Sequence, residues 1–262
     1  MVLPHTHTAS PRWFKRKNYE ALAIARAKGK PHLFITMTCN PNNPHILAAI
    51  DENMDPSDSP DIIARIFKQH VQELINMLYN GDVPGWENAI GQIYVIEFQK
   101  RGLPHVHLLV ILKRDYAIED DDIDKYSVAR IPNIDNDEDD KLWNHVVTKM
   151  VHRPCGEFNS KSKCMDNVKR KCCFGYPKEY QAVSYIDESG SAIYKRLSPD
   201  MGGNSAWIST PNSDGEYVDY EITDRDIVPY NAYLLKFLIV ILMLRFVPAL
   251  TLSNIFFGIR SR

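Results

Sequence analysis

The fold is decided by one stretch of the chain, Gly91-Gln-Ile-Tyr-Val-Ile-Glu-Phe-Gln-Lys-Arg-Gly-Leu-Pro-His-Val-His-Leu-Leu-Val-Ile-Leu112. Two short runs in it, 93–98 and 107–112, are rich in β-branched and apolar residues, and Gly102 and Pro104 lie in the link between them. Such runs on either side of a turn predict a β-hairpin.

The hairpin carries a candidate metal site. Side chains alternate between the two faces of a strand, so His105 and His107 share one face while Val106 points into the core. A suitable hairpin register brings the carboxylate of Glu97, on the other arm, beside both imidazoles. Imidazoles and a carboxylate are ligands for a divalent metal. The alternative is two surface histidines on a half-buried strand.

These motifs resemble those of known DNA-processing proteins. The histidine pair is similar to the His-hydrophobic-His motif of rolling-circle replication and transposition endonucleases, and Glu97 lies eight residues before His105, a spacing similar to that in viral replication initiators. The amino-acid sequence from Val95 to Leu109 more closely resembles that of the Helitron helicase-like N-terminal domain. The run Leu33-Phe-Ile-Thr-Met-Thr-Cys-Asn-Pro41, which predicts a strand and a turn, is similar to the first rolling-circle motif of that family.

The resemblance implies an α+β fold, with a mainly antiparallel sheet of the ferredoxin-like type, helices packed on it and an irregular Cys-containing basic segment. It implies Mg²⁺ or Mn²⁺ held by Glu97, His105 and His107, and single-stranded DNA as the partner. DNA contacts are expected from polar and basic residues near the hairpin: Thr36, Thr38, Asn40, Lys100 and Arg101. Full-length relatives carry a downstream helicase module, and the family works in the nucleus.

A second candidate site lies in residues 152–178, whose composition predicts little regular structure. Soft ligands in this segment suit Zn²⁺, namely His152, Cys155, Cys164 and Cys172. The Cys-x8-Cys-x7-Cys spacing is not one of the tight zinc-finger spacings, so inert thiols in a basic loop are the alternative. One isolated and four clustered cysteines favour a reducing compartment over a disulfide scaffold.

Charge is distributed unevenly along the chain. The net charge of −2 gives no global argument for nucleic acid. However, residues 12–30 hold seven Lys or Arg against one Glu, and residues 149–196 hold ten against five acids. These zones predict a phosphate-binding face, with a solvated surface as the alternative. The acidic stretch 115–140 predicts an exposed loop.

Helical periodicity appears in three places. Apolar residues recur at helical spacing after Ser59-Pro60 and stop at Gly81, which predicts a capped helix. Shorter helices are expected over 20–28 and 141–151.

The chain divides into four segments: a basic N-terminal segment 1–32, an endonuclease-like core 33–151, a Cys/Lys-rich extension 152–237 of the same domain, and a divergent apolar tail 238–262. In the family, a strand similar to Cys-His-Ile-Asn-Val-Glu and a helix with two nucleophilic tyrosines follow residue 237. Here no tyrosine follows Tyr233. Codons exist for Ile239–Pro248 that read Cys-His-Ile-Asn-Val-Glu-Ile-Cys in another frame, so we hypothesise that the tail is out of frame.

The sequence therefore predicts a fragment of a Helitron rolling-circle transposase, a metal-dependent domain that nicks and joins single-stranded DNA. It predicts a catalytic defect because the tyrosine-bearing helix is missing, with Tyr230 and Tyr233 as weak substitutes. The alternative is a non-catalytic DNA-binding module derived from a transposon. No membrane span is expected in the tail, because its apolar run before Arg245 is shorter than the roughly 20 residues that a span needs.

Overall fold

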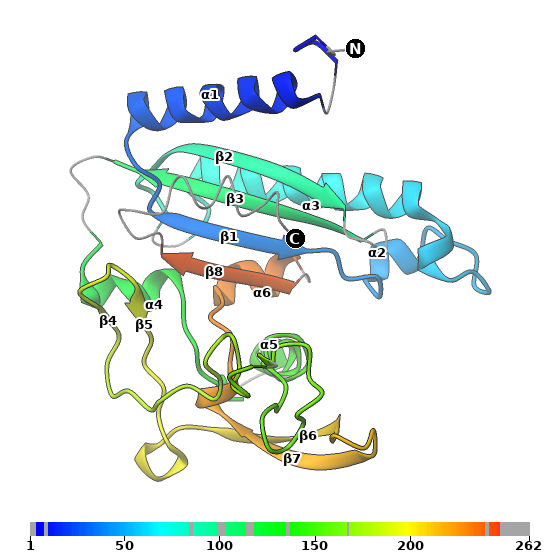
Figure 1. Cartoon of the computed structure of the whole chain (residues 1–262), viewed down its shortest axis with the longest axis vertical. Coiled ribbons are helices and arrows are strands. Elements are labelled where there is room, and N and C mark those ends of the chain that lie inside the picture. The colour runs from blue at the N-terminus through cyan, green and yellow to red at the C-terminus, as the bar shows by residue number, and fades with distance from the viewer. Residues whose placement is uncertain are drawn as a thin grey trace.

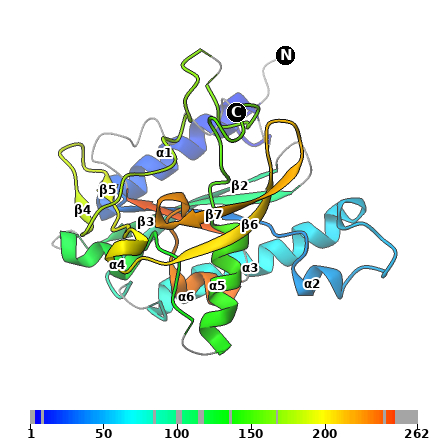
Figure 2. The same cartoon turned by 90° about the horizontal axis from the view of Figure 1, so that it is seen from below.

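The computed structural model describes residues 4–7, 10–83, 86–98, 103–113, 118–134, 137–166, 168–238 and 241–246 (Figures 1 and 2). The helices are α1 (Pro11–Lys28), α2 (Pro44–Leu47), α3 (Pro60–Asn80), α4 (Ile123–Tyr126), α5 (Asp137–Lys149) and α6 (Ala232–Leu238). The strands are β1 (Leu33–Thr38), β2 (Ala89–Phe98), β3 (Pro104–Leu112), β4 (Tyr185–Ile186), β5 (Ala192–Ile193), β6 (Ser205–Pro211), β7 (Tyr217–Thr223) and β8 (Ile241–Phe246).

The main sheet has the strand order β2-β3-β1-β8, and every neighbouring pair in it is antiparallel. Two smaller antiparallel ribbons, β4–β5 and β6–β7, lie below it in Figure 1. The predicted α+β class with antiparallel sheets is therefore confirmed.

The sheet buries one face against α3. Leu33, Ile35 and Met37 alternate along β1 and are fully buried, as the period of a half-buried strand requires. They share a core with apolar residues of α3 such as Phe67 and Leu74. The predicted boundaries of this helix are confirmed, since Pro60 lies in its first turn and Gly81 ends it in the left-handed conformation with φ of 74°.

A second apolar core lies apart from the sheet. It joins α5 to β6 and β7 through side chains such as Val146, Ala206 and Ile222. Helix α6 touches both cores, because Leu234 packs with the sheet core and Leu235 packs with the second core. This helix therefore connects the two halves seen in Figure 1.

Two expectations about local structure are wrong. Helix α1 begins at Pro11, nine residues before the predicted start, because Ser10 Oγ accepts a hydrogen bond from Trp13 N at 3.1 Å and caps it. Ala21 is the only buried residue of α1. A helix with so little buried surface needs few apolar residues, so the apolar periodicity of this segment is weak. The acidic stretch is not an exposed loop throughout, since Ile123 and Tyr126 of α4 are fully buried.

Among the residues that the structure describes, no helix combines the length and apolar character that crossing a bilayer demands. The expected division at residues 32, 151 and 237 stays a prediction. Of the apolar tail, residues 241–246 form β8 beside β1, and residues 247–262 lie outside the described part.

Acidification is expected to weaken the fold through His70. This α3 residue is 6% exposed, its Nε2 lies 3.3 Å from His45 Nδ1, and burial lowers its pKa. The unfolded chain therefore takes up the proton at a higher pH than the folded chain, and stability falls as pH falls below about 6.5. The contribution is at most about 1.4 kcal/mol per pH unit.

Urea unfolding at pH 7.5 and 5.5 measures this effect. We expect His70→Gln to lose less stability on acidification than the wild type, and His145→Gln on α5 to lose as much as the wild type. Equal pH dependence of the wild type and His70→Gln would contradict the assignment.

Candidate functional site

The strand register brings the predicted sheet residues together. Strand β3 lies between β1 and β2, and its His105 lies opposite both Thr38 and Glu97. Its His107 lies opposite Thr36 on β1. Directly opposed residues share a face, so these five residues form one surface, which we call the histidine face. Val106 points the other way and is buried in the core, as the alternation predicts.

Contacts on the histidine face hold both rings. Thr38 Oγ1 lies 2.8 Å from Nδ1 of His105, and Thr36 Oγ1 lies 3.2 Å from Nδ1 of His107. Glu97 Oε2 lies 3.5 Å from Nε2 of His107. The ring of Phe34 stacks on that of His107, with centroids 5.5 Å apart and planes 8° apart.

The histidine rings present one nitrogen each to a ligand. A threonine hydroxyl engages Nδ1 in both cases, so Nε2 is the nitrogen that can bind an ion, as in sites where a second partner fixes the ring. Burial lowers the pKa of His105, and the neighbouring His107 lowers it further. The neutral imidazole that results is the form that binds metals.

The donor set of the histidine face fits some ions better than others. Imidazole nitrogen suits transition metals, whereas Mg²⁺ prefers oxygen ligands. Two imidazoles and one carboxylate thus fit Mn²⁺ better than Mg²⁺. Among the described residues, only His152, Cys155, Cys164 and Cys172 have donor atoms that all lie within 4.8 Å of one another, and the histidine face does not meet that condition.

The other residues expected at this site lie in different surroundings. Asn40 is buried in the turn after β1, where its Oδ1 accepts a hydrogen bond from Asn42 N at 3.1 Å. Lys100 and Arg101 lie outside the described residues. Tyr230 is buried in the second core and its hydroxyl donates to Arg130 O at 3.0 Å, whereas Tyr233 on α6 is 40% exposed.

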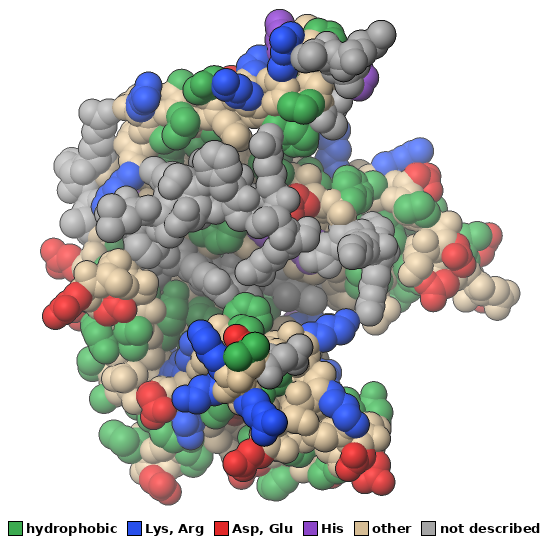
Figure 3. All heavy atoms as spheres, viewed as in Figure 1, with side chains coloured by type: hydrophobic (Ala, Val, Ile, Leu, Met, Phe, Trp, Pro, Cys, Tyr) green, Lys and Arg blue, Asp and Glu red, His purple; other side chains and the backbone are tan. Residues whose placement is uncertain are grey.

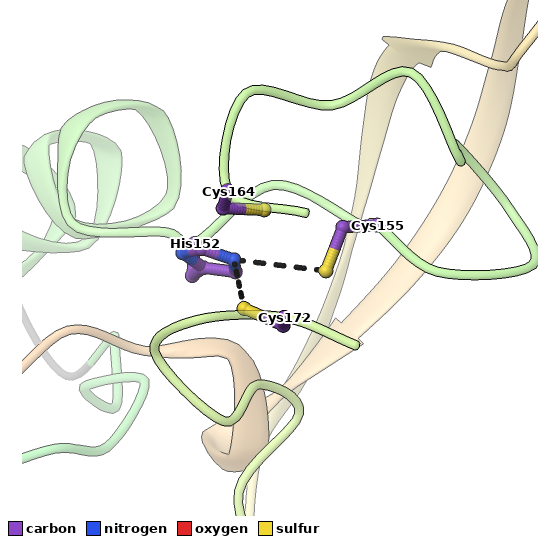
Figure 4. A group of neighbouring side chains, drawn as sticks. All are labelled: His152, Cys155, Cys164 and Cys172. Atoms are coloured by element: carbon purple, nitrogen blue, oxygen red, sulfur yellow. Dashed lines mark hydrogen bonds between the residues drawn. The ribbon is translucent and has the colours of Figure 1, made fainter. Parts of the chain in front are cut away.

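The structure also gathers the second set of predicted ligands, which we call the His/Cys cluster (Figure 4). Nε2 of His152 lies 3.7 Å from Sγ of Cys155 and 3.4 Å from Sγ of Cys172, and Cys164 completes the group. A tetrahedral Zn²⁺ with bonds of about 2.3 Å to sulfur and 2.0–2.1 Å to nitrogen separates these atoms by about 3.6 Å. The two observed distances lie on either side of that value.

Local turns bring these ligands together although no helix or strand lies between α5 and β4 in the described chain. Asp166 Oδ1 accepts hydrogen bonds from Val168 N and Lys169 N, which closes a turn between the last two ligands. Cys173 N then donates to Cys164 O at 2.8 Å. The expected lack of regular structure over 152–178 is confirmed. Hydrogen-bonded turns take the place of helices and strands in this segment.

The electrostatics of the cluster differ among its thiols. Burial raises the pKa of Cys155 to about 12, and Cys164 and Cys172 add to the rise. Burial also acts to raise the pKa of Cys172, but hydrogen bonds from the backbone N–H groups of Tyr176 and Phe174 lower it overall. A thiolate is the form that binds metals, so Cys172 is prepared for that role by the turn that follows it.

Several residues that shape the two sites were not anticipated. Phe34 stacks on His107, and Tyr176 stacks on His152 with ring centroids 4.2 Å apart and planes 13° apart. The parity of Phe34 with Thr36 and Thr38 along β1 was the available signal for the first contact. Nothing in the linear spacing indicated the second.

Fold and site together define an antiparallel α+β domain with an acid and a His-x-His pair on the sheet face that lies opposite Val106, and a separate His/Cys cluster. Residues 1–110 match the family described as the Helitron helicase-like domain at N-terminus. This match confirms the resemblance predicted from the sequence over that part of the chain, which includes Glu97, His105 and His107. The His/Cys cluster lies beyond the matched residues. A search of the curated proteins found no match.

Proposed function

We propose that the histidine face binds a divalent ion together with a phosphate of single-stranded DNA. The observation that carries this proposal is the convergence of Glu97 and His107 to 3.5 Å, next to a second histidine of the same face, within a segment that matches the Helitron domain. A divalent ion bound there supplies Lewis-acid polarisation of the phosphodiester.

The residues of the chain itself orient this site. The hydroxyls of Thr36 and Thr38 fix the rotation of the two rings, and Phe34 fixes the plane of His107. Because the ligands come from adjacent strands of a hydrogen-bonded sheet, their spacing is set before any ligand arrives. The site is thus preorganised to bind a phosphate oxygen in one orientation.

Binding without efficient strand cleavage is the expected outcome. A tyrosine nucleophile needs an accessible hydroxyl of lowered pKa or an adjacent base. Burial raises the pKa of Tyr230, whose hydroxyl donates to a backbone carbonyl in the second core. Tyr233 is the remaining tyrosine of this segment, and none follows it in the sequence. We therefore expect the histidine face to bind the strand without efficient cleavage by either of these tyrosines.

Alanine at His105 and His107 tests the proposal. We expect titration with Mn²⁺, followed by electron paramagnetic resonance, to show at least a tenfold loss of affinity in either variant, because each loses a direct ligand. His145→Ala on α5 is the matched control and keeps the wild-type affinity. Unchanged Mn²⁺ binding in both variants would instead favour the metal-free DNA-binding module.

Incubation of the protein with Mn²⁺ and a labelled single-stranded oligonucleotide tests the absence of cleavage. We expect a complex that denaturing electrophoresis dissociates completely. A covalent adduct mapped to a tyrosine would show that a nucleophile is present after all.

We also propose that the His/Cys cluster binds Zn²⁺ as a structural cofactor. The support is the separation of Nε2 of His152 from two sulfurs by 3.4 and 3.7 Å, together with the backbone N–H groups that face Cys172. Zinc sites with four protein ligands stabilise folds that lack regular structure. This role suits the loops between α5 and β4.

A further inference from the structure

The turn that carries the last cluster ligand also forms one wall of a surface cavity. The cavity has a volume of about 730 Å³ and lies between residues 173–178 and the β4–β5 ribbon. Its volume falls in the range of roughly 300–1,000 Å³ that is typical of small-molecule sites. None of the residues of the histidine face or of the His/Cys cluster lines the cavity.

Aromatic side chains line this cavity from both sides. Phe174, which is 43% exposed, and Tyr176 come from the turn, whereas Tyr185 and Tyr194 come from the β4–β5 ribbon. Planar rings with accessible faces stack on nucleobases of any sequence, and this is the main contact by which proteins bind unpaired DNA. The ring of Tyr176 is stacked on His152 and has Lys178 Nζ over it, so the exposed ring of Phe174 is the one in this wall that a flat heterocycle would meet.

Basic residues are frequent in the segment that forms one wall of the cavity. Residues 152–178 hold seven Lys or Arg against two acids, and Figure 3 shows Lys and Arg side chains gathered on the lower part of the molecule. Lys178 lines the cavity, with its Nζ 5.0 Å from the ring centroid of Tyr176 and 2.6 Å from Phe174 O. The cavity also contains Glu179, whose Oε1 lies 3.8 Å from Nη2 of Arg225.

The aromatic wall formed by Phe174 and Tyr176 contacts the His/Cys cluster. The backbone N–H groups of Phe174 and Tyr176 donate to Cys172, and the ring of Tyr176 stacks on His152. Cys172 therefore contacts both aromatic residues through their backbone N–H groups. His152 contacts Tyr176 through its ring.

We propose that this cavity binds an unpaired nucleobase of single-stranded DNA, and that the metal-organised turn holds its aromatic wall in place. The proposal rests on the proposed DNA-binding function and adds a second point of contact, distant in sequence from the histidine face. Stacking supplies affinity without sequence choice, and Lys178 in the cavity lining neutralises a phosphate.

Cys173 provides a direct readout, because its exposed thiol lines the cavity and is not a cluster ligand. The full chain is treated with N-ethylmaleimide in the presence and absence of a thymidine 20-mer, and mass spectrometry of the peptide that contains Cys173 gives the rate of its alkylation. We expect the oligonucleotide to slow alkylation at least fivefold, and a 20-mer of abasic sites to give little protection.

Variants separate stacking from charge. Phe174→Ala is expected to weaken binding of the thymidine 20-mer fivefold to tenfold and to abolish protection of Cys173, without changing the response of the protein to Mn²⁺. Lys178→Gln is expected to reduce the slope of log affinity against log salt concentration by about 0.7. Tyr217→Ala is the matched control, since this exposed aromatic lies on β7 outside the cavity.

The outcomes distinguish this inference from the proposed function. Oligonucleotide binding that depends on His107 but leaves Cys173 unprotected would contradict the nucleobase site in the cavity. The proposed function of the histidine face would still hold. Equal protection by the abasic strand, or an unchanged affinity of Phe174→Ala, would also overturn it. Protection of Cys173 that persists when His107 is replaced supports the nucleobase site in the cavity alone. If no strand binds the protein, both the nucleobase site and the proposed function are contradicted.

Discussion

Replacement of Cys172 by Ser is expected to release zinc from the protein and to unfold the loops between α5 and β4. Three thiols and one imidazole of these loops have donor atoms that all lie within 4.8 Å of one another. Nε2 of His152 lies 3.7 and 3.4 Å from two of the sulfurs, close to the separation of about 3.6 Å that tetrahedral zinc gives. In small zinc-folded peptides the ion contributes on the order of 10 kcal/mol, so loss of one ligand removes most of the local stability.

Metal analysis and limited proteolysis check this expectation. The wild type should hold about one zinc per chain, and the variant should hold almost none and be cut rapidly between residues 157 and 171. Cys173→Ser is the matched control, because Cys173 adjoins the ligand but is exposed and outside the cluster. Replacement of zinc by Co²⁺ should also give thiolate charge-transfer absorption. Wild-type zinc content in Cys172→Ser would show that the thiols are inert.

Asp224→Ala is expected to destabilise the second core by about 3–5 kcal/mol. The carboxylate is 1% exposed, and it accepts hydrogen bonds from Ile131 N at 2.8 Å and from Leu197 N at 3.0 Å. It therefore connects three distant segments of the chain. The variant leaves the N–H groups of Ile131 and Leu197 without their acceptor and removes the negative charge near the buried Arg196.

Chemical unfolding followed by hydrogen exchange measures this loss. Exchange should accelerate most in β6, β7 and α5, because these elements make up the second core. Asp219→Ala on β7 removes an exposed carboxylate and should change the free energy of unfolding by less than about 0.5 kcal/mol. A change below 1 kcal/mol for Asp224→Ala would show that water or rearranged backbone groups replace the carboxylate.

The sheet and its histidine face were largely predictable because their determinants are local. Alternation of apolar residues fixes which side chains of β1 are buried, and the same alternation along β3 places Val106 in the core and His105 and His107 on the opposite face. The same alternation along β2 places Glu97 on the face that carries the histidines. The stack of Phe34 on His107 required the order of β1 and β3 in the sheet, which the hairpin alone does not specify.

The second half of the molecule was less predictable because its structure depends on contacts between distant residues. Asp224, Arg196 and Tyr176 make their main contacts with residues far along the chain, and no periodicity marks them. The spacing of the cysteines did not separate a metal site from inert thiols. Their convergence on His152 depends on the turns around Asp166 and Cys172.

The inner position of β3 has a consequence for the register of the sheet. Val106 and Leu108 lie in the core shared with α3, so a slip of one residue along β3 would move both to the histidine face and turn the two imidazoles toward α3. Folding alone therefore maintains the display of these rings, whether or not DNA is ever cut.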